Sequence, residues 1–290
     1  MHKFLRAIGF SDITKKDFEM ILDEVITRPE IMKITKDSEG NEFAELSGSF
    51  AANAGITVRG TYQEDDSFHM DYYYPYVFGT SITTNEQIDV EKHAEKESYA
   101  GVCDEVNLGV TLIFYIQNVA DYLAETNRHL SKIHYGAMLA GLSTEGKILC
   151  PVVERKKNDV PAIQKNDRHN QLIAQAREGD EDAIESLTLE DMDTYALLSQ
   201  RVMKEDIFSI VKSTFMPFGI ESDQYTVLGE IIDCVTMENK LTHEKLYGMK
   251  LLCNNIQFDV CINEKDLLGE PAIGRRFRGN VWMQGNLCLE

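Results

Sequence analysis

A chain of 290 residues with 43% hydrophobic and 27% charged side chains has the composition of an ordinary globular protein, and its length predicts two domains or one large one. Its 48 acidic and 29 basic residues give a net charge of -19 at pH 7. Such an excess of negative charge repels nucleic acids and anionic membranes at long range, so the composition argues against both as partners.

No targeting segment is recognisable in the sequence. The first residues, Met1 to Arg6, lack the apolar run of about 7–15 residues that forms a secretory signal. The longest apolar stretch, around 110–116, is too short to cross a bilayer. Six cysteines are scattered without a CxxC pair, which favours small buried side chains over disulfides or metal ligands. These features together predict a cytoplasmic protein.

Residues 1–30 have the pattern of helices. Thr14 and Asp17 form a capping pattern, because the threonine hydroxyl accepts from a free amide at the start of a helix. Arg28-Pro29 ends the helix, since a residue before proline disfavours the helical conformation. The apolar stripe of this helix consists of Phe18, Ile21, Leu22, Val25 and Ile26.

The period changes to two between residues 43 and 84, which predicts strands. Segments 55–62 and 68–78 are joined by acidic turn residues, and we expect them to form a β-hairpin. Four tyrosines between Tyr72 and Tyr76 follow His69 and Asp71. Such a strand suits the interface of a homo-oligomer, where tyrosine is enriched. A metal site at the histidine and aspartate stays open, but no third ligand is identifiable.

The middle of the chain alternates between strand and helix. A strand at 110–116 is expected to pass into a helix at 118–124, and a strand pattern returns at 136–153 with a turn at 144–146. Residues 156–170 form a polar linker. Helices follow, and the last of them is predicted from Glu205 to Phe215. The acidic stretch 178–193 matches the first turns of these helices better than a metal site.

The last segment reads as a small closed sheet. Strands are predicted at 225–232, 245–252, 256–262 and 279–285, and Asn254-Asn255 forms a tight turn between two of them. Short strands with a glycine inside one of them resemble an OB-like barrel. The sequence therefore predicts an α+β protein: a mixed domain with an antiparallel sheet at 1–155, a linker and helical segment at 156–218, and an all-β barrel-like domain at 219–290.

Three arginines near the end of the chain are the best candidates for binding a ligand. Arg275, Arg276 and Arg278 lie beside the single tryptophan, Trp282, in a chain that is otherwise strongly acidic. Guanidinium groups bind phosphate or carboxylate in a fork geometry, and an indole ring stacks on other rings. The alternative is a surface hairpin whose arginines pair with nearby acids while Trp282 lies in the barrel core.

No motif that defines a reaction is present. The sequence lacks a GxSxG elbow, a GxxxxGK phosphate loop and a glycine-rich dinucleotide fingerprint. These absences disfavour a serine hydrolase, an ATPase and a Rossmann oxidoreductase. They leave the catalytic residues unknown and predict no metal or cofactor.

Three segments carry a resemblance to a known family. Residues 181–195, residues 215–225 and residues 274–285, which include Gly274-Arg-Arg-Phe-Arg-Gly279, resemble a bacterial family of unknown function from anaerobic Gram-positive bacteria. The resemblance covers essentially the whole chain. It implies a bacterial, intracellular protein, and it brings no activity and no site residues.

Two hypotheses of function remain. The first is a cytoplasmic binding or interaction protein without catalytic activity, which forms an oligomer through its tyrosine-rich strand. The second is an enzyme or ligand-binding protein that acts on a small anionic metabolite at the arginine hairpin. Binding of single-stranded nucleic acid is not expected, because residues 219–290 contain seven basic and eleven acidic side chains.

Overall fold

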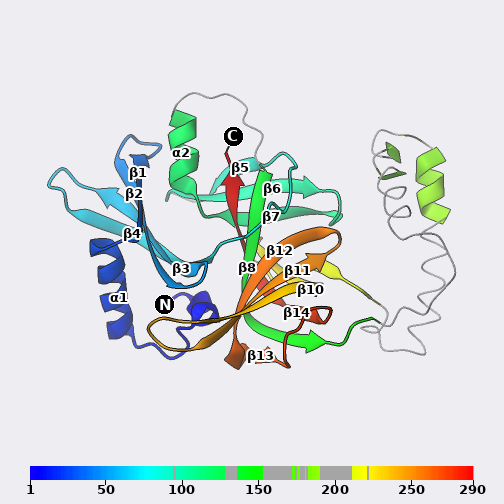
Figure 1. Cartoon of the computed structure of the whole chain (residues 1–290). Helices are drawn as coiled ribbons and strands as arrows, with labels where there is room; N and C mark the ends of the chain where they lie inside the picture. Colours follow the sequence, from blue (N-terminus) through cyan, green and yellow to red (C-terminus); the bar gives the residue numbers. More distant parts are fainter. Residues whose placement is uncertain are drawn as a thin grey trace. The chain divides into compact units, whose positions relative to one another are not determined.

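The computed structural model describes residues 1–93, 96–127, 136–152, 172–173, 175–176, 180, 182–189, 211–220 and 222–289. The chain divides into two compact units, Met1–Leu149 with Ser213–Glu290, and Cys150–Lys212. In the second unit, residues 182–189 are helical. All labelled helices and strands belong to the first unit (Figure 1).

Two short helices open the first unit. The 3-10 helix η1 spans Lys3–Ile8 and the helix α1 spans Lys15–Thr27. Thr14 caps α1 by accepting a hydrogen bond from the backbone N–H of Asp17 at 3.2 Å, so the predicted cap is confirmed. The apolar stripe of α1 packs against the first sheet. No helix among the described residues has both the length and the hydropathy needed to cross a bilayer.

The first sheet is an antiparallel meander of four strands in chain order. They are β1 (Ile31–Lys36), β2 (Glu42–Ala51), β3 (Ala54–Tyr62) and β4 (Phe68–Val77). The predicted hairpin is confirmed, because β3 and β4 pair from Tyr62 opposite Phe68 to Ala54 opposite Val77.

The second sheet contains ten strands and includes a closed barrel. Its first part consists of β5 (Asp89–His93), β6 (Ser98–Glu105) and β7 (Val110–Ile116), followed by helix α2 (Val119–Asn127) and the long strand β8 (Gly136–Leu149). After the second unit come β9 (Thr214–Pro217), β10 (Gln224–Glu238), β11 (Lys245–Cys253), β12 (Ile256–Asn263), η2 (Glu264–Asp266), β13 (Leu267–Leu268) and β14 (Arg276–Cys288).

Five strands form the barrel in the order β8-β12-β11-β10-β14, and β14 pairs back with β8. The predicted α+β class with an OB-like barrel is thus confirmed. Four of the strands come from the C-terminal segment, but the fifth, β8, precedes the linker (Figure 1). As in an OB barrel, the last strand of a three-strand meander has a parallel neighbour. Here that neighbour is β8, which precedes the other four barrel strands in the sequence.

The turn predicted at 144–146 is wrong. These residues lie inside β8, and the pairing of β8 with β14 jumps from Glu145 opposite Asn280 to Ser143 opposite Val281. Thr144 is therefore an extra residue in the ladder. A bulge of this kind bends a strand and increases its twist, which a small barrel requires.

The helix predicted at 205–215 is wrong over residues 211–215, the part of it that the structure describes. Residues 211–213 have no regular structure, and Thr214–Pro217 is strand β9, antiparallel to β10. Phe215 is buried, with its ring centroid 4.5 Å from that of Tyr225. Pairing with β10 therefore overrides the helical pattern. Residues 205–210 lie outside the described residues, as does much of the acidic stretch.

Two apolar clusters hold the unit together. One fills the barrel and extends to β6, β7 and α2, and the other joins η1, α1 and the first sheet to the outside of the barrel. Cys103, Cys253 and Cys261 are buried, and burial raises the pKa of each thiol to about 12. The six cysteines, all within the described residues, form no disulfide. Cys150 is exposed, against the expectation of burial.

Candidate functional site

The three arginines of the predicted site have different surroundings. Arg275 precedes β14, is exposed and donates from Nη1 to the carbonyl oxygen of Glu270 at 2.7 Å. Arg276 is the first residue of β14 and is only 5% exposed. Arg278 is half-buried and lines a surface cleft. Of the residues proposed from the sequence, the structure places Arg278 in this cleft.

Trp282 lies further along β14, under η1. Its Nε1 donates to Asp223 Oδ2 at 2.7 Å, and its ring stacks on that of Phe4 with centroids 5.3 Å apart. The imidazole of His2 covers it at 4.8 Å. Burial, together with the charge of Lys3, lowers the pKa of His2 to about 4. The indole is therefore a packing element, and it is absent from the lining of the cleft.

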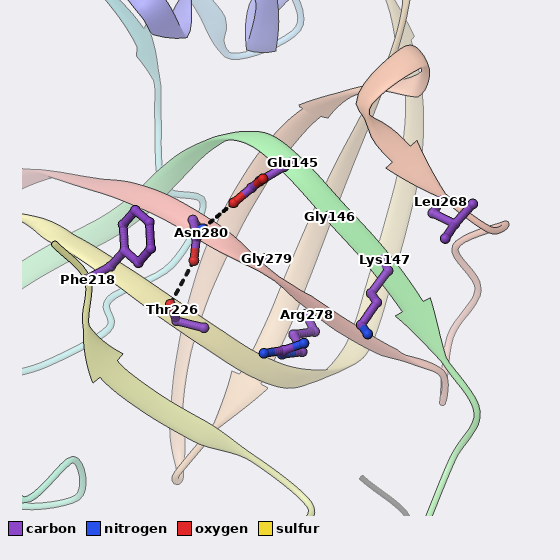
Figure 2. Close-up of a pocket in the computed structure, with 9 residues that line it drawn as sticks. All are labelled: Glu145, Gly146, Lys147, Phe218, Thr226, Leu268, Arg278, Gly279 and Asn280. Carbon is purple, nitrogen blue, oxygen red and sulfur yellow. Dashed lines mark hydrogen bonds between the residues drawn. The ribbon is translucent and has the colours of Figure 1, made fainter.

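The cleft lies on the outer face of the barrel over β8, β14 and β10 (Figure 2), and its volume is ≈ 460 Å³. Its lining residues are Glu145, Gly146, Lys147, Phe218, Thr226, Leu268, Arg278, Gly279 and Asn280. Side chains alternate along a strand, so Arg278 and Asn280 face outward while Phe277 and Val281 fill the barrel.

Strand register brings two cations together at one end of the cleft. Arg278 of β14 stands directly opposite Lys147 of β8. Figure 2 shows the two side chains next to each other. Both side chains can donate hydrogen bonds to one anion placed between them.

The other end of the cleft has a fixed set of hydrogen bonds. Thr226 donates from Oγ1 to Asn280 Oδ1 at 2.7 Å, and Asn280 Nδ2 donates to the carboxylate of Glu145. This chain crosses all three strands and fixes the orientation of the Asn280 amide. Asn280 lies two positions after Arg278, so the acidic end lies roughly 6–7 Å along the strand from the cationic end.

The two glycines of the cleft have a packing role. Gly146 and Gly279 are opposite each other, and a Cβ atom on Gly279 would lie 2.5 Å from Phe277 Cζ inside the barrel. The ring of Phe277 therefore requires both positions to lack a side chain.

Sequence reasoning missed most of the cleft. Lys147 and Glu145 lie near the middle of the chain, before the linker, and only the closure of the barrel by β8 brings them beside Arg278. One signal was available, because a five-stranded barrel needed one strand more than the four predicted in the C-terminal segment. Nothing in the sequence showed which earlier strand would supply it.

Another arginine, Arg59 on β3, was not among the candidates predicted from the sequence. Its side chain is fully buried, and its Nε donates to Glu45 Oε1 at 2.7 Å. Nη1 donates to the hydroxyls of Tyr72 and Tyr115 at 2.9 and 2.7 Å. Nη2 donates to the hydroxyl of Tyr74 and to the carbonyl oxygens of Ile116 and Gln117. This arginine fastens the first sheet to the end of β7.

The described residues contain no group of three or more His, Cys, Asp or Glu side chains arranged to hold a metal ion. His69 and Asp71, which the sequence leaves open as a metal site, lie on β4. Nothing in the described part of the chain completes it.

A family sequence model matches residues 5–285, which is nearly the whole chain. The family is described as "Domain of unknown function, E. rectale Gene description (DUF3881)". The chain belongs to this family. The resemblance to a bacterial family without an assigned activity is thereby confirmed. No curated protein and no solved structure matches the chain significantly. The family supplies no site residues, and the cleft is defined by its geometry alone.

Proposed function

We propose that the protein binds a small molecule that carries a phosphate or carboxylate group, in the cleft over β8, β14 and β10. The observation that carries the proposal is the placement of Lys147 directly opposite Arg278 in the wall of that cleft. Arginine and lysine donate charge-assisted hydrogen bonds to anionic oxygens, which are about twice as strong as neutral ones. Binding without chemistry is the simplest role for these groups.

The rest of the cleft narrows the class of ligand. The hydrogen-bonded pair Glu145 and Asn280 suits hydroxyl or amine groups roughly 6–7 Å from the anion. Phe218 and Leu268 flank the cleft and are 42% and 75% exposed, so they offer apolar contacts. A phosphorylated or carboxylated metabolite with several hydroxyl groups fits this arrangement better than a simple inorganic anion.

Nucleic acid is not the expected partner. OB barrels bind oligonucleotides on the second and third strands of the meander, which here are β11 and β12. Lys250 on that face donates to Ser81 Oγ at 3.2 Å, and Asp259 accepts from Thr80 N at 2.7 Å. Cys261 Sγ donates to the Ala7 carbonyl oxygen beneath η1. The chain's own segments therefore occupy this face.

We also propose a cytoplasmic location, because cysteines that form no disulfide bonds are typical of a reducing compartment. A homo-oligomer stays a prediction. The tyrosines expected to form its interface make contacts within the chain: Tyr74 and Tyr76 are 3% and 2% exposed, and Tyr72 binds Arg59.

Isothermal titration with glucose 6-phosphate and with glucose tests the proposal, because the two probes differ only in the phosphate. We expect the purified protein to bind glucose 6-phosphate at least about tenfold more tightly than glucose. Arg278→Gln and Lys147→Gln should each weaken binding of the phosphate by about tenfold or more.

Arg275→Gln is the matched control, since Arg275 lies three residues away and outside the cleft lining. It should leave the affinity unchanged. Equal effects of Arg275→Gln and Arg278→Gln would reject the site. If neither glucose 6-phosphate nor a carboxylate probe such as gluconate binds, the proposal of an anion-binding function is wrong.

A further inference from the structure

The strand β1 forms one edge of the first sheet, because β2 is its only partner strand among the described residues. Its side chains are apolar for such a position: Ile31, Met32 and Ile34 are 45%, 48% and 46% exposed. Native proteins protect the edges of their sheets with charges, prolines or covering segments, because an open edge pairs with other chains. The apolar edge of β1 is therefore a candidate interaction surface.

The other edges of the two sheets are protected in these ways. On β4, the carbonyl oxygen of Asp71 accepts from Lys96 Nζ at 2.9 Å, and that of Pro75 accepts from Gln284 Nε2 at 2.9 Å. The edge strand β5 of the second sheet has mostly charged side chains. The exposed apolar side chains of β1 thus distinguish it from β4 and β5.

The backbone of β1 has hydrogen-bonding groups that point away from β2. The backbone N–H of Asp37, just after the strand, donates to the Asn41 carbonyl oxygen on the β2 side. The carbonyl oxygen of Lys36 points the other way, since it accepts from a side chain of α2 at 2.9 Å. These directions alternate along an antiparallel strand, so the N–H and C=O groups of Ile34 and Met32 also point away from β2. These groups can pair with a further strand.

Alternate side chains of β1 form a row on one face of the sheet. Met32 and Ile34 lie on the side that packs against α1, because their partners on β2 belong to the apolar cluster around that helix. By the alternation of side chains, Glu30 and Lys36 continue the row at its two ends, and both are exposed. The row therefore consists of an acid, two apolar side chains and a base.

This row complements a second copy of itself. When two β1 strands run antiparallel with Met32 opposite Ile34 of the partner subunit, Glu30 lies opposite Lys36 of the partner subunit at both ends. Met32 and Ile34 of the partner subunit then exchange both of their backbone hydrogen bonds. A shift of the register by two residues places Lys36 opposite Arg28 or Met32 of the partner subunit and loses the charge pairs.

The other face of β1 is compatible with the same register. Lys33 lies opposite its own copy there, and like charges directly opposite each other are destabilising. Its Nζ, however, donates to Asp121 Oδ2 of α2 at 2.6 Å, so each chain compensates this charge internally. Ile31 lies opposite Thr35 of the partner subunit, which pairs two β-branched side chains.

We infer that β1 is the interface of a homodimer, in which the first sheets of two copies join into one antiparallel sheet across a twofold axis. Such an interface is isologous, because the same strand serves both subunits. Two paired strands make a small interface, so the dimer is weak and depends on concentration. The oligomer contact is thereby assigned to β1 in place of the tyrosine-rich β4, and it is independent of ligand binding in the cleft.

Sedimentation velocity of the full chain tests the dimer. The net charge of -19 on each chain opposes association, so the salt concentration should be about 0.15 M, where charges more than about 8 Å apart are largely screened. We expect the average mass to rise with concentration towards twice the mass of one chain. A monomer at every concentration would show that β1 does not pair with a second copy.

A charge exchange tests the register. Glu30→Lys and Lys36→Glu should each weaken dimerisation by about tenfold, because each places like charges at both ends of the interface. An equimolar mixture of the two variants should restore it, since every end then joins opposite charges. The mixture is also the control for folding, because a misfolded variant could not recover the dimer. If neither variant weakens the dimer, or the mixture does not recover it, the inference is rejected.

A matched pair of substitutions tests the apolar part of the interface. Ile34 and Ile82 are 46% and 56% exposed, and Ile82 lies outside the strands. Ile34→Lys places a charge against Met32 of the partner subunit and should weaken dimerisation by about tenfold or more. Ile82→Lys should leave it unchanged. Equal effects of the two substitutions would show that the dimer does not form through β1.

Discussion

Two arginines, Arg59 on β3 and Arg278 on β14, have contrasting surroundings. Arg59 is fully buried, and Glu45, three tyrosine hydroxyls and two carbonyl oxygens surround its guanidinium. Arg278 is half-buried at the wall of an open cleft and stands beside a second cation. Burial and a full set of acceptors indicate a structural arginine, whereas placement beside a like charge at a cleft is the basis of the anion-binding proposal.

Removing Arg59 is the change with the largest expected effect. In Arg59→Met, the carboxylate of Glu45 stays buried without its cation, and we expect the free energy of unfolding to fall by about 3–5 kcal/mol. Urea denaturation measures this loss. Arg275→Met is the control and should change stability by less than about 1 kcal/mol. If Arg59→Met also loses less than about 1 kcal/mol, Arg59 is not a structural arginine.

The pH dependence of stability tests the packing at the Trp282 end of β14. The pKa of His2 is lowered from 6.5 to about 4, so the folded protein disfavours the protonated imidazole. Between these two pH values the unfolded chain binds the proton and the folded chain does not. The contribution of neutral His2 to the free energy of unfolding is therefore complete above about pH 6.5. The free energy of unfolding falls by about 2–3 kcal/mol as the pH approaches 4.

Denaturation of the unmodified protein and of His2→Asn from pH 7 to pH 4 measures this contribution. Asparagine retains an acceptor for the backbone N–H of Phe4, which His2 Nδ1 accepts at 3.4 Å. The variant should lose less stability over this range. Identical pH profiles would show that His2 is not held neutral under η1.

Trp282→Phe separates packing from ligand binding. The substitution removes the hydrogen bond from Nε1 to Asp223 and part of the stacked area, which should cost about 1–2 kcal/mol. Binding of glucose 6-phosphate should stay as it was, because Trp282 does not line the cleft. A weakened affinity without a loss of stability would return the indole to the ligand site.

Lys147→Gln should have the smallest effect on stability. It removes one of two like charges facing each other across β8 and β14, and we expect a change within about 0.5 kcal/mol in the free energy of unfolding. The same variant should reduce the salt dependence of glucose 6-phosphate binding, since one cation fewer faces the phosphate. An unchanged salt dependence would remove Lys147 from the site.

Much of the local structure was predictable from the sequence, because it depends on neighbouring residues. The cap at Thr14, the stop before Pro29 and the turn at Asn254-Asn255, where both residues have positive φ, are examples. The strand at 214–217 could not be predicted in this way, because Phe215 is extended only through its pairing with β10 and its burial against Tyr225.

The candidate site was predictable only in part. The excess of basic residues near Arg278 was visible in the sequence. Because side chains alternate along a strand, Arg278 faces the cleft while Phe277 points into the barrel. Lys147 lies 131 positions earlier in the chain, and the register of β8 against β14 decides that it stands opposite Arg278. Arg59 gave no local signal, because its acceptors come from β2, β4 and the end of β7.

The most direct measurement is an NMR titration of the full chain with glucose 6-phosphate, following the backbone amides. If the phosphate binds between Lys147 and Arg278, the amides of residues 145–147 and 278–280 should show the largest chemical-shift changes, and those of residues 57–61 around Arg59 should not move. Shifts confined to other surfaces, or none at all at millimolar probe, would contradict the assignment of the cleft as the ligand site.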